Sequence, residues 1–181
     1  MIDSLNIDIF PDTQQQYKEQ IKTLYIDTFT QGSSAQWVDA DALEEELALT
    51  YQKGLMLVAV NGSELAGALF IYPLSDDSLL PTSISRDLNI SKIPYIAELM
   101  VAASCRGCGL GSRMMNEAME LLRASNFHQV YIRVWDQNTA ALKLYEKLGF
   151  SFAGTADQTK YSFPDKKPMI MHKIYLHKEL Q

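Results

Sequence analysis

A glycine-rich turn between an apolar, strand-like stretch and a helical pattern constrains this 181-residue chain more than any other feature: Arg106-Gly107-Cys108-Gly109-Leu110-Gly111-Ser112. Glycines let the backbone turn sharply, and the start of a helix presents unpaired N–H groups with a partial positive charge. Such a turn binds phosphates with the help of few side chains. Three glycines in five positions, with Arg106 and Arg113 beside them, predict an anion site. The alternative is a tight strand-to-helix turn without a ligand.

Two well-known phosphate motifs do not fit this turn. A dinucleotide fingerprint requires a further glycine where this chain has Ser112 or Met114, and an acidic residue about twenty positions on, where Val130–Arg133 stands. A P-loop requires a lysine after its last glycine, but Ser112 follows Gly111. We therefore do not expect a dinucleotide or a nucleoside triphosphate here.

Cys105 and Cys108 are the only cysteines, and they form a Cys-x-x-Cys before a helix. A thiol at a helix N-terminus has a lowered pKa, so a redox-active or redox-regulated protein is one alternative. A pair of ordinary reduced thiols is the other. A structural zinc site would need two more ligands, and the spacing of His128, His172 and His177 does not supply them, so no metal is expected.

The composition excludes several classes of protein. Hydrophobic residues make up 47% of the chain and charged residues 21%, which excludes disorder, a collagen-like repeat and a coiled coil. The apolar stretches are too short to span a bilayer, and Asp3 and Asp8 stand where a signal peptide would be apolar, so we expect a cytoplasmic protein.

No basic face is available for nucleic acid. Residues 27–50 hold six acids and no Lys or Arg, which indicates either a cationic partner or a solvated helix face.

Hydrophobic periodicity predicts an α/β fold in one domain that covers residues 1–181. Strands are expected at Leu5–Phe10, Met56–Val60, Leu65–Tyr72, Tyr95–Val101 and Val130–Val134, and near Phe150–Thr155 and Met169–Leu176. Helices are expected from Thr13 to about Phe29, from Asp41 to Gly54, from Gly109 to about Ser125 and over Thr139–Leu148. Asn61-Gly62 predicts a hairpin. The Pro73–Ile93 segment is long for a loop, so we expect a function or a short helix there. The alternation of elements implies a mixed sheet covered by helices.

Two motifs resemble those of the GNAT superfamily of N-acetyltransferases. The first is Glu98-Leu99-Met100-Val101 followed by Arg106–Gly111, which is similar to the Arg/Gln-x-x-Gly-x-Gly/Ala motif. The second is Asn138–Phe150, which has the family's Asn, Ala and Tyr-x-x-x-Gly-Phe pattern. The resemblance implies a GNAT-like, mostly antiparallel sheet of six to seven strands, flanked by about four helices.

The resemblance also implies acetyl-CoA as cosubstrate and a role for each motif residue. Backbone amides of Arg106, Gly107, Cys108, Gly109, Leu110, Gly111 and Ser112 would hold the pyrophosphate. The backbone of Leu99, Met100 and Val101 would pair with the pantetheine arm and polarise the thioester carbonyl. Asn138 would hydrogen-bond the pantetheine or cap its own helix. Tyr145 would protonate the departing thiolate, the alternative being a core aromatic.

A base must also remove a proton from the attacking amine. Glu98 is the only acid on the motif strand, and in the family an acid near this point often serves as base, directly or through water. The alternative is a salt-bridged edge residue. Asp76 and Asp77 in the long loop are weaker candidates. Asp39, Asp41 and Glu44–Glu46 would suit a cationic acceptor, and Trp37 would offer a face to a cation or pack between helices.

We therefore predict a transferase that acetylates a primary amine by direct attack in a ternary complex. The acceptor would be a small molecule or a peptide amine, with no nucleic acid or membrane involved. The alternatives are an inactive coenzyme A sensor or interaction module, and a protein regulated by Cys105 and Cys108. Dimers are common in the family, so a homodimer stays open, although no apolar surface stripe predicts one.

Overall fold

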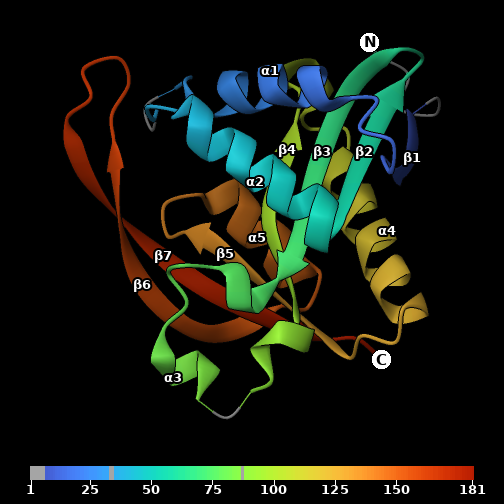
Figure 1. The fold of residues 1–181 in the computed structure, drawn as a ribbon, viewed down its shortest axis with the longest axis vertical. Helices are drawn as coiled ribbons and strands as arrows, with labels where there is room; N and C mark the ends of the chain where they lie inside the picture. Colours follow the sequence, from blue (N-terminus) through green and yellow to red (C-terminus); the bar gives the residue numbers. More distant parts are fainter. Residues whose placement is uncertain (1–6, 33–34, 87) are drawn as a thin grey trace.

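One mixed sheet runs through the part of the chain that the structure, a computed structural model, describes: residues 7–32, 35–86 and 88–181 (Figure 1). Its strand order is β1-β2-β3-β4-β5-β7-β6, and every pair of neighbours is antiparallel except β4 and β5. Leu5 and Asn6 of the first predicted strand lie outside the described residues. The strands are β1 (Ile7–Pro11), β2 (Leu55–Asn61), β3 (Glu64–Pro73), β4 (Pro94–Val101), β5 (Gln129–Trp135), β6 (Ser151–Tyr161) and β7 (Pro168–Glu179).

Helices cover both faces of this sheet. On one face, α1 (Lys18–Phe29) and α2 (Ala40–Lys53) bury apolar side chains against β2, β3 and Met100 of β4. On the other, α4 (Leu110–Ala124) and α5 (Thr139–Lys147) bury theirs against the same strands and β5. α3 (Thr82–Ser85) is a single turn. The predicted α/β class, with a mixed and mostly antiparallel sheet, is confirmed.

The local signals placed most elements correctly, but two helix starts differ. The predicted hairpin is present, but its turn consists of Gly62 and Ser63, because Asn61 still pairs with Glu64, and Gly62 adopts φ +64° there. The first helix begins at Lys18 rather than near Thr13, because the buried Asp12 carboxylate accepts hydrogen bonds from the backbone N–H groups of Gln16 and Tyr17 at 3.0 and 3.1 Å. The second begins at Ala40, because Asp39 rather than Asp41 caps it.

The long hairpin of β6 and β7 extends beyond the rest of the sheet toward the segment between α1 and α2 (Figure 1). Gln36 bridges Ser162, and the Trp37 backbone N–H donates to the Tyr161 carbonyl at 2.6 Å. β6 is longer than predicted because its outer half, Ala156–Tyr161, is mostly polar and carries a weak hydrophobic signal. The Pro73–Ile93 segment contains α3 and two 3-10 turns, Leu74–Asp76 and Ile90–Lys92.

Candidate active site

The sheet opens between its two parallel strands. β4 and β5 pair only at Tyr95 with Tyr131 and at Ile96 with Ile132. The register of β4 against β3 shifts just beyond, where Phe70 lies opposite Glu98 but Ile71 lies opposite Ile96. This bulge at Ala97 bends β4, and bulges of this kind commonly end pairing beside functional sites.

A cavity of about 200 Å³, here called the narrow cavity, occupies this opening. The residues that line it include Glu98 and Leu99 of β4, Val134 of β5, and Asn138, Ala141 and Tyr145 at α5. Three residues predicted from two separate motifs, Glu98, Asn138 and Tyr145, therefore meet at one site.

The β4 backbone beside this cavity has one free edge. Leu99, Met100 and Val101 pair with Leu69, Ala68 and Gly67 of β3, but the ladder toward β5 has already ended. Side chains alternate as predicted: Met100 is buried under α1 and α2, whereas Leu99 and Val101 pack toward α4 and α5. The Val101 carbonyl accepts a hydrogen bond from Arg106 Nε, and the other backbone groups of this stretch that point toward β5 are available to a ligand.

Tyr145 is held on the buried face of α5. Its side chain is 5% exposed, and its ring packs against Phe150 with 5.8 Å between centroids. Burial, and then the charge of Glu98, raise the pKa of the Tyr145 hydroxyl, so it stays protonated at neutral pH. At the start of the same helix, the Asn138 side chain accepts from the Ala141 backbone N–H at 3.2 Å, which is the capping role predicted for it.

Glu98 lies on a central strand, just beyond the last residue of β4 that pairs with β5, so the strand has a free edge at this point. Within the described residues no cation lies within 4.0 Å of its carboxylate, which removes the salt-bridged alternative. Burial, and then the nearby Glu46, raise the pKa of Glu98 to about 8. A carboxyl group tuned in this way can accept a proton close to physiological pH.

The glycine-rich turn is open to a ligand. Gly107 and Gly109 have φ values of +76° and +82°, which side-chain-bearing residues rarely adopt, and no atom lies within 4 Å of where their Cβ would stand. Gly109 is the N-cap of α4 and no side chain caps that end, while Leu110 anchors the helix in the core. Gly111 and Ser112 follow in the first turn. The exposed backbone from Gly107 to Gly109 can thus receive an anion.

The arginines and cysteines around this turn have local partners. Arg106 Nε donates to the Val101 carbonyl at 3.0 Å, and Arg113 Nη2 donates to the Ile7 carbonyl at 2.8 Å. Both cysteines are free: Cys105 is buried in the core, and the exposed Cys108 donates to the Cys105 carbonyl at 2.7 Å. The side chains therefore shape the turn. The Arg106 backbone N–H donates to the Ala103 carbonyl at 3.4 Å, so the amides left for an anion begin after Arg106.

A second cavity, here called the wide cavity, adjoins the first and measures about 530 Å³. It lies between α1, α2 and the β6–β7 hairpin, and Glu98, Arg133 and Lys173 line both cavities. Sequence reasoning missed three charged residues here: Arg133, Lys160 and Lys173. It included Glu46 only as one member of the acidic run Glu44–Glu46.

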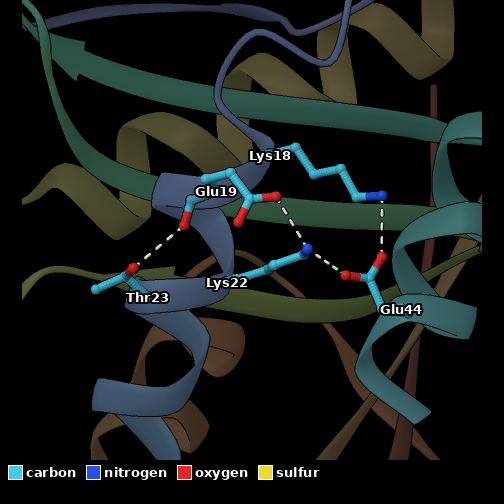
Figure 2. A network of polar contacts seen from close by, with 5 residues as sticks. All are labelled: Lys18, Glu19, Lys22, Thr23 and Glu44. Carbon is cyan, nitrogen blue, oxygen red and sulfur yellow. Dashed lines mark hydrogen bonds and ion pairs between the residues drawn. The ribbon is translucent and has the colours of Figure 1, made fainter. Parts of the chain in front are cut away.

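Two of the six acids of the acidic segment, Asp39 and Glu44, have structural partners that tie α2 in place. Figure 2 shows Glu44 of α2 binding Lys18, at 2.9 Å, and Lys22 of α1, and these contacts hold the pKa of Glu44 below its usual value. Asp39 caps α2. Of the predicted acidic wall, only Asp39 and Glu46 line the wide cavity. The segment mainly joins α1 to α2 and caps a helix.

Asp76 and Asp77, the weaker candidates for the catalytic base, are held in ion pairs outside the two cavities. Trp37 already has a cation beside its ring. Asp76 pairs with Lys53 at 2.7 Å, and Asp77 pairs with Arg133 at 2.6 Å; neither acid lines either cavity. Trp37 packs against Phe163 of the hairpin rather than between helices, and Lys166 Nζ lies 4.8 Å from the centre of its ring.

Neither a membrane-spanning helix nor a metal-binding cluster is found among the described residues. In the described part of the chain, no helix has the length and apolarity that a membrane crossing needs. Among those residues, no group of three or more His, Cys, Asp and Glu side chains is placed to hold a metal ion.

Comparison with known proteins identifies the family. The model of the acetyltransferase (GNAT) family matches residues 18–150. GCN5-related N-acetyltransferase 6, chloroplastic, from Arabidopsis thaliana is 43% identical over 61 residues, or 34% of this chain and 21% of that protein. N-alpha-acetyltransferase 40 from Saccharomyces cerevisiae is 29% identical over 113 residues, or 58% of this chain and 39% of that protein. The matches thus span less than half the length of either relative.

Solved structures share the fold. Ribosomal-protein-alanine N-acetyltransferase from Brucella melitensis superposes with a TM-score of 0.72 at 19% identity, covering 96% of this chain and 99% of that one. A Salmonella typhimurium structure with its cofactor acetyl-CoA gives 0.67 at 16% identity, covering 97% and 95%. The fold is therefore that of an acetyltransferase. The chain belongs to the GNAT family, whose cosubstrate is acetyl-CoA, and the predicted resemblance is confirmed.

Proposed function

We propose that this protein transfers the acetyl group of acetyl-CoA to a primary amine by direct attack within a ternary complex. The observation that carries the proposal is the pair of adjoining cavities: Glu98 lines both, and Tyr145 lines the narrow one. An amine in the wide cavity would therefore meet a donor in the narrow cavity beside a base and an acid. Holding both reactants together is the main requirement of such a reaction.

The residues of the opened sheet fit acetyl-CoA, which supplies an acetyl group activated as a thioester. The amides of residues 107–112 would bind the pyrophosphate, because Gly107 and Gly109 leave the turn uncovered, whereas the Arg106 amide donates to the Ala103 carbonyl. The free edge of Leu99–Val101 would pair with the pantetheine arm. Asn138, exposed at the rim of the narrow cavity, would contact the same arm while it caps α5.

Proton movements then fall to two side chains. Glu98 would take a proton from the ammonium group, directly or through water, as the nitrogen forms its bond to the acetyl carbon. A backbone N–H of β4 would stabilise the oxyanion that develops. Tyr145 would give its proton to the sulfur as the C–S bond breaks, which leaves an amide and coenzyme A. The nitrogen also loses its second proton, which restores the Tyr145 hydroxyl directly or through water, and the proton on Glu98 returns to solvent.

Three further expectations remain proposals. The described sheet extends from Ile7 to Glu179 without a break into separate sheets, which supports a single GNAT-type domain over residues 1–181. A cytoplasmic location and a homodimer rest on the sequence and on the family alone.

Calorimetric titration of the reduced protein with acetyl-CoA, with NAD as control ligand, is the first test. We expect saturable one-site binding of acetyl-CoA only, and then release of free coenzyme A thiol when primary amines are supplied. Binding without turnover on any amine or peptide would favour the sensor alternative. Absence of acetyl-CoA binding would remove the proposed function altogether.

A further inference from the structure

The wide cavity carries charges of both signs that do not pair with each other. The carboxylates of Glu46 and Glu98 enter it from α2 and β4, and the ammonium groups of Lys160, Lys166 and Lys173 enter it from the β6–β7 hairpin. Within the described residues, none of these five side chains makes an ion pair within 4.0 Å. The acids of the cavity thus come from α2 and β4, and its lysines come from the β6–β7 hairpin.

The other charged residues of this cavity are already matched. Arg133 is neutralised by Asp77, which also accepts from the Tyr175 hydroxyl at 2.7 Å. The Asp39 carboxylate accepts from two backbone N–H groups at the start of α2. Two acids and three lysines are therefore left without an ion-pair partner among the described residues, although Glu46 accepts from the Tyr25 hydroxyl at 3.4 Å and Lys166 lies beside the Trp37 ring.

The presence of three lysines beside two acids in the wide cavity disfavours an acceptor that carries only positive charge. Burial raises the pKa of Glu46, and it raises the pKa of Glu98 to about 8. Burial lowers the pKa of Lys173 to about 8, which still leaves it mostly protonated. Three lysines therefore stand against two unpaired acids in the lining, although the sequence around α2 is acidic.

We propose that the acceptor is a primary amine that also carries a carboxylate, bound with its amine toward Glu98 and its carboxylate toward Lys160 and Lys166. The orientation follows from the lining: Glu98 reaches the narrow cavity, where the acetyl group would lie, whereas Lys160 and Lys166 line only the wide one. In such a ligand the amine gives the acids of the wide cavity a partner of opposite charge, and the carboxylate does the same for the lysines. The inference rests on the proposed function and narrows its substrate class.

The size of the cavity is compatible with such a ligand. A volume of about 530 Å³ lies in the range of small-molecule sites. A carboxylate-bearing amine can come from a free amino acid or from the N-terminus of a peptide with an acidic residue beside it. The chemistry is shared, so the experiment must separate the two sources.

The test compares matched ligands on protein saturated with coenzyme A. Calorimetry gives the Kd of 4-aminobutyrate against 4-aminobutanamide, of the peptide Ala-Glu-Ala-amide against Ala-Gln-Ala-amide, and of putrescine. The same amines are then assayed for acetylation with acetyl-CoA. Lys160→Gln removes one lysine of the anionic subsite, and Lys167→Gln serves as control, because Lys167 is exposed, pairs with Asp165 and does not line the cavity.

We expect the acidic member of at least one pair to bind about tenfold more tightly than its amide, with putrescine weaker still. Lys160→Gln should bring that ratio close to one, and Lys167→Gln should leave it unchanged. A preference within the 4-aminobutyrate pair indicates a free amino acid as acceptor. A preference within the peptide pair indicates a peptide N-terminus. Equal binding of acids and amides, tighter binding of putrescine, or a ratio unaffected by Lys160→Gln overturns the inference. Selective binding without acetylation supports the inference and contradicts the proposed function instead.

Discussion

Arg133 Nη1 lies 2.6 Å from Asp77 Oδ1, and this contact ties β5 to the long loop between β3 and β4. The Asp77 side chain is 3% exposed and that of Arg133 17%, so the pair is largely removed from water. Arg133 also faces the rings of Tyr95 and Tyr175 at 5.9 and 5.8 Å. The pair fixes one wall of both cavities, and it explains why a loop acid resembling a catalytic base is structural.

Replacement of Asp77 by Ala should lower the free energy of unfolding by about 3–5 kcal/mol, because Arg133 would remain charged, buried and unpaired. Urea denaturation followed by circular dichroism measures this change. Asp76→Ala is the matched control: its ion pair with Lys53 is more exposed, so its loss should cost about 1 kcal/mol or less. Equal effects of the two substitutions would show that the buried pair contributes little.

Glu98→Gln should reduce kcat/KM by about 100-fold and change its pH dependence. Because the pKa of Glu98 is raised to about 8, the active carboxylate form accumulates as pH rises through that value, and kcat/KM of the native protein should rise with it. In Glu98→Gln this ascending limb should be absent. Steady-state rates between pH 6 and 9.5 measure this ascending limb. A limb that is retained in Glu98→Gln would show that another group causes it.

Substitution of Lys173 provides an independent check that Glu98 causes the ascending limb of the pH profile. Its positive charge lowers the pKa of Glu98, so Lys173→Met should shift the ascending limb to higher pH without abolishing it. A shift to lower pH would contradict this electrostatic arrangement. The charged groups that act on the pKa of Glu98 are Glu46 of α2, Arg133 of β5, Lys160 of β6 and Lys173 of β7.

Tyr145→Phe should lower kcat by about 100-fold and leave acetyl-CoA affinity nearly unchanged, because it removes only the hydroxyl that would protonate the leaving thiolate. The packing of the ring against Phe150 is retained. Tyr131→Phe is a suitable control, since Tyr131 is also buried but lines neither cavity. If both variants turn over at the native rate, Tyr145 is a core aromatic and the thiolate leaves without it.

Gly109→Ala should weaken acetyl-CoA binding by about tenfold, measured by calorimetry. The φ of +82° disfavours any side chain, by roughly 1–2 kcal/mol, so the turn should rearrange and lose its alignment of amides. Gly62→Ala introduces comparable strain at φ +64° in the β2–β3 hairpin, which the proposed phosphate site does not include. It should lower stability but not affinity. Equal affinity losses would mean that the effect is global.

Oxidation should leave acetyl-CoA affinity unchanged. Cys105 is 5% exposed in the core, whereas Cys108 is exposed, and the Cys108 thiol donates to a backbone carbonyl. Titrations with and without reductant, repeated on Cys108→Ser, test this expectation. A lower affinity of the oxidised native protein that Cys108→Ser does not show would revive the redox alternative.

Features encoded in contiguous residues were determined by the sequence alone. The glycine-rich turn, the Asn61-Gly62 hairpin, the amphipathic α4 and the two family motifs depend on local conformation and on the periodicity of side chains, so they could be predicted. Glu98, Asn138 and Tyr145 followed from those motifs, and the structure brings all three to the narrow cavity.

The charges of the wide cavity were decided only by the tertiary structure. Glu44 and Glu46 are nearly adjacent in an acidic run, yet Glu44 turns to the lysines of α1 and Glu46 turns into the cavity. Asp77 binds Arg133 from a distant strand, and Lys160 and Lys173 reach the site from a hairpin whose polar sequence gave little signal. The reason is physical: desolvation and pairing depend on which elements pack together, and those partners lie far apart along the chain.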